Sequence, residues 1–159
     1  TDEREVALDD FYHDYMVNDL QPGEFIARIR IPRAAAGVIV SSQKWSKRFD
    51  QDISAVCTAY RLELADDKVS NFRMACGGLA ATVRRAAHCE NAVNGQVWND
   101  ETIAAACAAL VQDFTPISDM RASADMRLLA TQNLLRRFFL ESTGDAPERL
   151  YSYRRTGSR

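Results

Sequence analysis

Apolar residues recur at every second position in the first half of the chain and at helical spacing in the second half. The two-residue period predicts strands in four segments: residues 24–31, 37–47, 54–64 and 69–76. Helical spacing follows in three segments: residues 82–93, residues from about 99 to a loop at 115–118, and residues from about 119 to 142. This order predicts an α+β fold, in which an antiparallel sheet of three to four strands is followed by about three helices packed on one face. The other face and the edges are then free to meet another domain.

The first predicted strand, residues 24–31, is bounded by chain breaks. Pro22 and Gly23 interrupt the chain before it, and Pro32 ends it. Its apolar face carries Phe25, Ala27, Ile29 and Ile31. Ile26 lies on the opposite, polar face, where a scattered exposed apolar residue is common. Upstream, residues 8–19 predict a short helix or turn, because two aspartates precede a run of aromatic residues.

The third and fourth predicted strands set their own register. One face of the third carries Val56, Thr58, Tyr60, Leu62 and Leu64, and one face of the fourth carries Phe72, Met74 and Cys76. A two-residue turn would place Asn71 opposite Leu62, whereas a three-residue loop, residues 66–68, places Phe72 there. Register follows the buried face, so we predict the three-residue loop. Gly77 and Gly78 then end the strand or form a bulge.

The predicted helices carry apolar stripes between start and stop signals. The first has Val83, Ala86, Ala87 and Val93 before Asn94 and Gly95. The second is capped by Asn99 or Asp100 and carries Ile103, Ala106, Cys107, Leu110 and Val111. The third is capped by Asp119 or Ser123, presents Leu128, Leu135, Phe138 and Phe139 inward, and ends at Gly144 and Pro147. Residues 145–159 then form a polar tail.

Composition narrows the class of protein. The 159 residues are 47% hydrophobic and 26% charged, typical of one globular domain with a real core. A net charge of -2 argues against nucleic acid and anionic membranes as partners, and no apolar run is long enough to span a bilayer. The acidic start at residues 1–5, without an initiator methionine, predicts the middle of a longer chain.

The cysteines and histidines indicate structural roles. Cys57, Cys76, Cys89 and Cys107 are too widely spaced for a zinc or iron–sulfur motif. Cys57 and Cys76 fall in strand-like segments, where a buried free thiol is expected, and a reducing, cytoplasmic location follows. His13 and His88 lack a nearby acid or nucleophile in the sequence, which favours structural roles for both.

Candidate chemistry concentrates in residues 43–56. Val38, Ile39 and Val40 form the buried part of the preceding strand, which carries Lys44 to its far end. Lys44 and Arg48 near Trp45 and Phe49 would suit a flat, electron-rich ligand. The alternative is a solvated connection with local ion pairs, in keeping with its mixed charges. The residues alone leave both interpretations open.

Residues 43–56 are also where a family resemblance appears. Lys44, Arg48, Asp52 and Ile53, in this spacing, resemble the second domain of the flavoprotein subunit of molybdenum hydroxylases, with bacterial xanthine dehydrogenase small subunits most similar. Residues 115–127, Leu20 through Ile26, and the turn Cys76-Gly77-Gly78 resemble the same family in the expected order. The resemblance covers about residues 8–144, and it implies a fold like the CO dehydrogenase flavoprotein C-terminal domain.

The resemblance implies half of a cofactor site. No phosphate-cradling glycine loop is present, and in the family most FAD contacts come from a preceding domain. By position, Ile26 matches an aliphatic FAD contact, Lys44 a lysine beside the isoalloxazine, and Arg48 and Asp50 a loop near the flavin and NAD. Asp52 matches the aspartate before the isoleucine, with a structural role as acceptable as a functional one. Phe49 and Gln51 depart from charged residues of the mammalian enzymes, which leaves the preference for NAD or oxygen open.

The implied function is that of a domain closing over FAD in a xanthine dehydrogenase-type enzyme of purine catabolism. Electrons would pass from a molybdenum cofactor and 2Fe-2S clusters on other domains or subunits through FAD to NAD. Residues 1–23 would continue from a missing FAD-binding domain, residues 24–144 would form the C-terminal domain, and residues 145–159 the tail. Alone, the domain is expected to be inactive and able to self-associate. The alternatives are a flavin-free interaction module, or the same domain of a carbon monoxide, aldehyde or heterocycle dehydrogenase.

Overall fold

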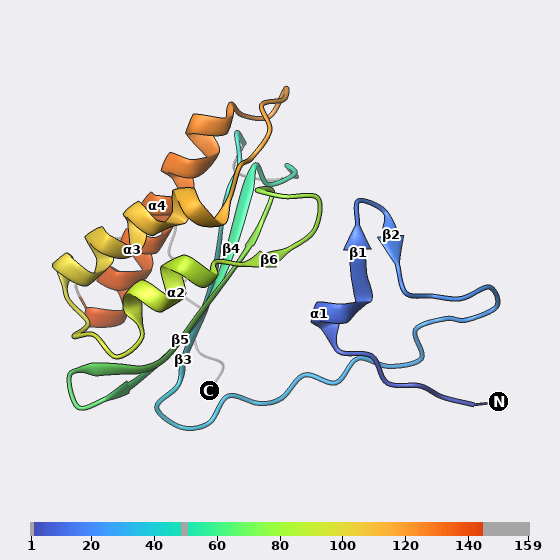
Figure 1. Ribbon diagram of the computed structural model, residues 1–159, viewed down its shortest axis with the longest axis horizontal. Helices are drawn as coiled ribbons and strands as arrows, with labels where there is room; N and C mark the ends of the chain where they lie inside the picture. The colour runs from blue at the N-terminus through green and yellow to red at the C-terminus, as the bar shows by residue number, and fades with distance from the viewer. Residues whose placement is uncertain (1, 49–50, 145–159) are drawn as a thin grey trace, which may run out of the picture.

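The computed structural model describes residues 2–48 and 51–144, and its main feature is a four-stranded antiparallel sheet. The strands lie in the order β3 (Ile39–Trp45), β4 (Val56–Ala65), β5 (Lys68–Gly77) and β6 (Arg84–Arg85). Three helices follow: α2 (Ala87–Val93), α3 (Asp100–Asp113) and α4 (Ala124–Thr143). Figure 1 shows the three helices on one face of this sheet. The predicted α+β class and its one-sided helical layer are confirmed.

The β4–β5 hairpin has the predicted buried pairs but a different turn. Leu62 pairs with Phe72, and Tyr60 pairs with Met74, as expected from the buried face. The turn nevertheless has two residues, because Ala65 pairs with Lys68 and Asp66 takes a positive φ of 54°. A register shift next to Glu63 restores the apolar pairing. The predicted three-residue loop was therefore wrong. An irregularity inside the strand shifts the pairing by one residue, and this shift brings the apolar residues opposite each other as the longer loop would have done.

The core lies between the sheet and the helices. Tyr60 from β4 stacks on Phe138 from α4 with ring centroids 4.4 Å apart, and Phe72 from β5 also contacts Phe138. The other fully buried large side chains include Leu62, Met74, Leu79, Leu110 and Leu135. Within residues 2–48 and 51–144, the opposite face of the sheet carries no helix (Figure 1). The hydrophobic layer thus lies on one side only, as the sequence predicts.

Two of the three helix starts are set by the nearest capping side chain. Asn99 accepts a hydrogen bond from the Thr102 amide, and Ser123 accepts one from the Met126 amide, so Asp119 is not the cap of α4. Gly144 takes a φ of 89° at the end of α4, as predicted, whereas Pro147 and the predicted tail at 145–159 lie outside the described residues.

Helix α2 begins later than predicted, because residues 84–85 form β6 instead of a first helical turn. Arg84 and Arg85 pair with Cys76 and Ala75 of β5. The N-cap residue, Ala86, has no capping side chain. The carboxylate of Asp113, from the end of α3, accepts hydrogen bonds from the His88 and Cys89 amides instead. The cap of α2 is thus supplied from 24 or 25 residues away in sequence.

Residues 2–37, which we call the N-terminal arm, contain α1 (Leu8–Phe11) and a hairpin of β1 (Tyr12–Asp14) and β2 (Val17–Asn18). The rest of the arm is extended, and Figure 1 shows it running beside the sheet–helix body, residues 38–48 and 51–144. The predicted strand at 24–31 was wrong, because this segment has no ladder partner and is exposed throughout. Phe25, Ile29 and Ile31 are 80%, 78% and 81% exposed. The alternation is real, but its apolar face is not buried by the described residues.

Some apolar positions of the body also differ from the prediction. Val40, Leu64 and Val111 are exposed rather than buried, and Cys57 is exposed on the helix-free face while Cys76 is buried. Val40 and Cys57 fall on that face because successive strand residues alternate between the two sides of the sheet. Within the described residues, no helix is both long and apolar enough to cross a membrane.

Candidate functional site

Lys44 lies next to the last residue of β3, on the face of the sheet without helices. Its ammonium donates a hydrogen bond to the carbonyl oxygen of Asp52 over 3.3 Å, and its side chain remains exposed. Lys44 belongs to a row of paired residues that crosses the sheet: it pairs with Cys57 of β4, and Cys57 pairs with Gly77 of β5. Lys44 therefore places a positive charge at the edge of a surface built from small side chains.

That surface continues through the preceding row of the sheet, in which Ser42 pairs with Ala59 and Ala59 pairs with Ala75. Directly opposed residues of an antiparallel pair project from the same face, so both rows share the helix-free side. Apart from Lys44, the residues that β3, β4 and β5 contribute to these rows are small, none longer than the thiol of Cys57, and Arg85 of β6 ends the second row. The sheet thus offers a flat area beside the Lys44 ammonium, which a planar ring system or a flat protein surface could cover.

Asp52 organises the β3–β4 connection. Its Oδ2 accepts a hydrogen bond from the Arg48 amide at 2.9 Å, and its Oδ1 lies 3.6 Å from Arg48 Nη2. The Arg48 amide, with the Arg48 charge adding to it, holds the pKa of Asp52 below its usual value. Asp52 is therefore ionised near neutral pH and ties the connection together, which supports the structural interpretation of its role.

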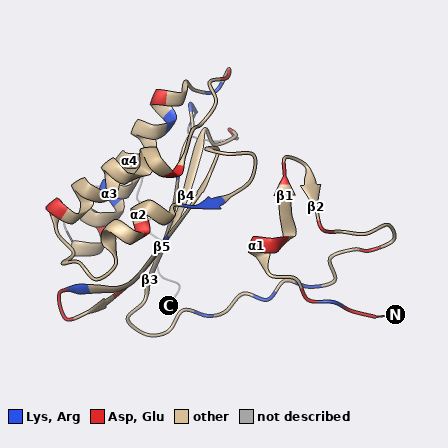
Figure 2. Ribbon diagram, in the orientation of Figure 1, with Lys and Arg blue, Asp and Glu red and all other residues tan. Residues whose placement is uncertain are grey.

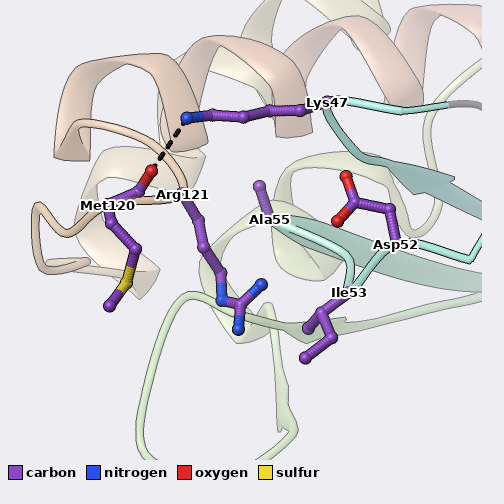
Figure 3. Close-up of a pocket in the computed structure, with 6 residues that line it drawn as sticks. All are labelled: Lys47, Asp52, Ile53, Ala55, Met120 and Arg121. Carbon is purple, nitrogen blue, oxygen red and sulfur yellow. Dashed lines mark hydrogen bonds between the residues drawn. The ribbon is translucent and has the colours of Figure 1, made fainter.

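A small pocket lies beside this connection, with a volume of about 130 Å³. Its lining comes from the connection and from the segment before α4: Lys47, Asp52, Ile53, Ala55, Met120 and Arg121. Figure 3 shows Lys47 reaching across to the Met120 carbonyl oxygen, a hydrogen bond of 2.8 Å, and the Arg121 guanidinium directed toward Ile53. Among the described residues the Arg121 guanidinium has no hydrogen-bond acceptor, so the pocket has a cationic wall.

The segment at 115–127 holds this pocket together through Asp119 and Arg127. Asp119 Oδ1 accepts hydrogen bonds from the Arg121 and Ala122 amides and from Arg127 Nη2. The Arg121 amide has the largest effect in lowering the pKa of Asp119, and Arg127 and the Ala122 amide lower it further. The structural interpretation of this segment is supported, but its central residue, Arg127, was missed. The available signal was a charged residue on the inner face of a helix, four positions before the buried Thr131.

The structure brings together two of the four site residues inferred from the resemblance. Lys44 and Arg48 lie at one end of β3 and both meet Asp52. Ile26 lies in the N-terminal arm and is 52% exposed. Among the described residues, no backbone hydrogen bond joins the arm to the end of the sheet that carries Lys44 and Arg48. Asp50 lies outside the described residues. All four assignments to the cofactor site stay predictions.

The matched family decides the class of the chain. Residues 41–142 match the CO dehydrogenase flavoprotein C-terminal domain, which is well over half of the chain. The chain belongs to this family. The match includes most of β3, the Lys44 connection, the small-residue surface and nearly all of α4. The site therefore lies inside the family domain, and the N-terminal arm lies before it.

Relatives of this flavoprotein C-terminal domain are subunits of oxidoreductases. It is 30% identical over 107 residues to a putative xanthine dehydrogenase FAD-binding subunit from Escherichia coli K12, which is 67% of this chain and 37% of that protein. It is 28% identical over 143 residues to the nicotine 6-hydroxylase medium subunit of Paenarthrobacter nicotinovorans, which is 87% of this chain and 48% of that protein. The chain thus spans about half the length of such subunits or less.

Solved structures give the same fold. The domain matches quinoline 2-oxidoreductase from Pseudomonas putida 86 with a TM-score of 0.79 and 25% identity, over 91% of this chain and 50% of that chain. It matches carbon monoxide dehydrogenase from Hydrogenophaga pseudoflava with a TM-score of 0.79 and 24% identity, over 87% of this chain and 48% of that one. Residues 38–159 make up less than 91% of the chain, so the match to quinoline 2-oxidoreductase must also include part of the N-terminal arm.

Proposed function

We propose that this flavoprotein C-terminal domain closes over FAD in a xanthine dehydrogenase-type enzyme. Electrons leaving a molybdenum cofactor and 2Fe-2S clusters on other domains or subunits would pass through the flavin to NAD. The observation that carries the proposal is the exposed Lys44 ammonium beside the flat surface of Ser42, Ala59, Ala75, Cys57 and Gly77. FAD, when bound, supplies the two-electron chemistry that NAD requires.

The residues present fit the ring end of the cofactor rather than its pyrophosphate. Lys44 would place a positive charge beside the ring, and Arg48, fixed by Asp52, would extend that charge along the same edge. Within the described residues, no glycine-rich loop leads into a helix N-terminus, where a pyrophosphate would be held. The pyrophosphate contacts would therefore come from a preceding FAD-binding domain, in keeping with relatives about twice as long.

The partners in this proposal are the FAD-binding domain, an iron–sulfur domain and a molybdenum-binding subunit, with NAD as acceptor. The helix-free sheet face and the N-terminal arm are the available surfaces for the FAD-binding domain, because both expose apolar residues. Figure 2 shows acidic and basic positions interspersed along the described ribbon. The four free cysteines suit the reducing cytoplasm that the sequence suggests.

The oxidised substrate lies outside the proposal, because relatives named for xanthine, nicotine, nicotinate, quinoline and carbon monoxide all share this domain. Purine catabolism is the assignment that the xanthine dehydrogenase relatives favour. The isolated chain is expected to bind FAD weakly, with no submicromolar complex in a fluorescence titration. Tight stoichiometric binding would show that the domain carries a complete FAD site by itself.

Lys44→Met in the complete enzyme tests the proposal directly. Loss of a positive charge beside the flavin disfavours the reduced, anionic cofactor, so NAD reduction should slow. The melting temperature should hardly change, because an exposed charge contributes less than about 1 kcal/mol to stability. The matched control is Lys68→Met, which removes an exposed lysine from the start of β5, next to the turn at the other end of the hairpin.

The two measurements separate the outcomes when made on one preparation. Slower NAD reduction in Lys44→Met alone, with FAD still bound, supports the flavin-facing role. Equal activity of the two variants removes Lys44 from the site. Absence of FAD from the complete parent protein would instead favour a flavin-free interaction module with the same fold.

A further inference from the structure

Arg127 is a buried arginine on the inner face of α4. Its residue is only 3% exposed, and its two terminal nitrogens reach acceptors on three separate segments. Nη1 donates to the carbonyl oxygens of Ala55 and Gly78, and Nη2 donates to Asp119 Oδ1 at 2.7 Å. Its Nε has no acceptor among the described residues. A buried guanidinium is tolerated only where such acceptors compensate its lost hydration, so its position is set by all three segments.

Each acceptor belongs to a segment that frames the site. Ala55 closes the β3–β4 connection, because its own amide donates to the Trp45 carbonyl oxygen at 2.9 Å. Asp119 begins the turn that presents the Met120 carbonyl oxygen to Lys47. Gly78 follows directly after β5, whose last residue, Gly77, shares the row of Lys44. One guanidinium therefore links the connection, the turn and the end of the small-residue surface.

We propose that Arg127 is a positioning residue for the Lys44 end of the sheet, a role that rests on the function proposed above. Arg127 does not reach the exposed face itself. It fixes the Ala55 end of the connection and, through Asp119, the turn that anchors Lys47. The planar fork of arginine is required, because Nη1 and Nη2 donate from two separate atoms, whereas all three donors of a lysine ammonium radiate from one nitrogen.

The first experiment separates local positioning from general stabilisation by hydrogen exchange of this chain. Arg127→Lys should raise exchange of the amides in residues 46–48, 51–55 and 119–122 by roughly tenfold or more. The paired amides at the centre of β4 and β5 should exchange as in the parent. The control is Arg136→Lys on the exposed side of α4, where the arginine donates to Asn133 Oδ1, and it should change neither region.

Two results overturn the inference. Equal loss of protection throughout the body would make Arg127 a general core residue, and unchanged protection of the connection would show that it positions nothing. If Arg127→Lys does not fold, Asp119→Asn gives the same measurement, because it keeps the arginine and weakens one of its three acceptors. Asp119→Asn should loosen residues 119–122 first.

The second experiment is a double-mutant cycle on the flavin reduction potential of the complete enzyme. Lys44→Met should lower the potential, Arg127→Lys should lower it in the same direction, and the double variant should fall short of the sum. No effect of Lys44→Met would remove the proposed function. A normal Lys44→Met effect with an unchanged potential in Arg127→Lys, or with strictly additive shifts, would remove only the role of Arg127.

Discussion

The N-terminal arm and the sheet–helix body use the same alternating pattern with opposite results. Phe72 in β5 is 1% exposed, whereas Phe25 in the arm is 80% exposed. The body buries its apolar face against α4, and the arm has no described layer to bury its face against. Alternation therefore indicates a face that needs cover, and it does not indicate whether the cover lies within the same chain.

The polar groups of the two regions differ as well. In the arm, ion pairs join Arg28 to Glu3, Arg30 to Glu5, and Arg4 to both Asp19 and Glu24. In the body, Arg127 and Asp113 connect helices to segments far away in sequence. The arm thus pairs these charges within itself, at exposed positions, while its apolar residues stay bare. This difference favours an apolar partner surface for the arm.

The largest difference between the regions is expected from removing one aromatic ring in each. Phe138→Ala should lower the free energy of unfolding by about 3–5 kcal/mol, because a buried ring stacked on Tyr60 is lost. Phe25→Ala should change it by less than about 0.5 kcal/mol. Urea unfolding followed by tryptophan fluorescence measures the body, since Trp45 and Trp98 both lie there. A cost above about 1 kcal/mol for Phe25→Ala would mean that the arm packs on the body.

A pair of glycines with similar backbone angles gives the next largest difference. Gly78 and Gly23 have φ values of 86° and 87°, but a Cβ at Gly78 would collide with the Ala55 carbonyl oxygen, and one at Gly23 would meet nothing within 4 Å. Gly78→Ala should therefore cost at least about 2 kcal/mol of unfolding free energy. Gly23→Ala is also strained by its positive φ, but this strain falls in the arm, so the unfolding transition of the body should stay within about 0.5 kcal/mol of the parent. Thermal melting of both variants checks this, and equal losses would contradict the division into two regions.

Sequence patterns predicted those features whose causes are local. The pairing of Leu62 with Phe72 follows from the buried face, and Asn99 and Ser123 cap the helices that they precede. The position of Lys44 near the end of β3 follows from the same alternation. Each of these results depends on residues within a few positions of one another or on one continuous apolar face.

Features that depend on distant partners were missed. Helix α2 starts where Asp113 can reach its amides, and no local signal marks that residue. Arg127 is buried because three acceptors converge on it from residues 55, 78 and 119. The segment at 24–31 was predicted as a strand because its pattern is that of a strand, but pairing needs a neighbour that the described residues do not supply.

The smallest expected difference concerns acid stability and compares two carboxylates. The pKa of Asp119 is lowered by the Arg121 amide and Arg127, and that of Glu24 is lowered to about 2, first by Arg4. A lowered folded-state pKa adds stability above the unfolded value, near pH 4, and this stability is lost as the pH falls through the folded pKa. Asp119→Asn should therefore make the free energy of unfolding of the body depend less steeply on pH in acid. The loss of slope should correspond to roughly one proton.

Glu24→Gln should leave that limb unchanged, because its ion pair joins two parts of the arm and does not reach the body. The measurement is urea unfolding by tryptophan fluorescence at several pH values between about 2 and 6. The unfolding midpoint of Glu24→Gln should follow the parent at every pH, while that of Asp119→Asn should converge with the parent only in acid. If both variants lost the same amount of pH dependence, the arm would unfold together with the body. The two regions would then not differ in the way proposed here.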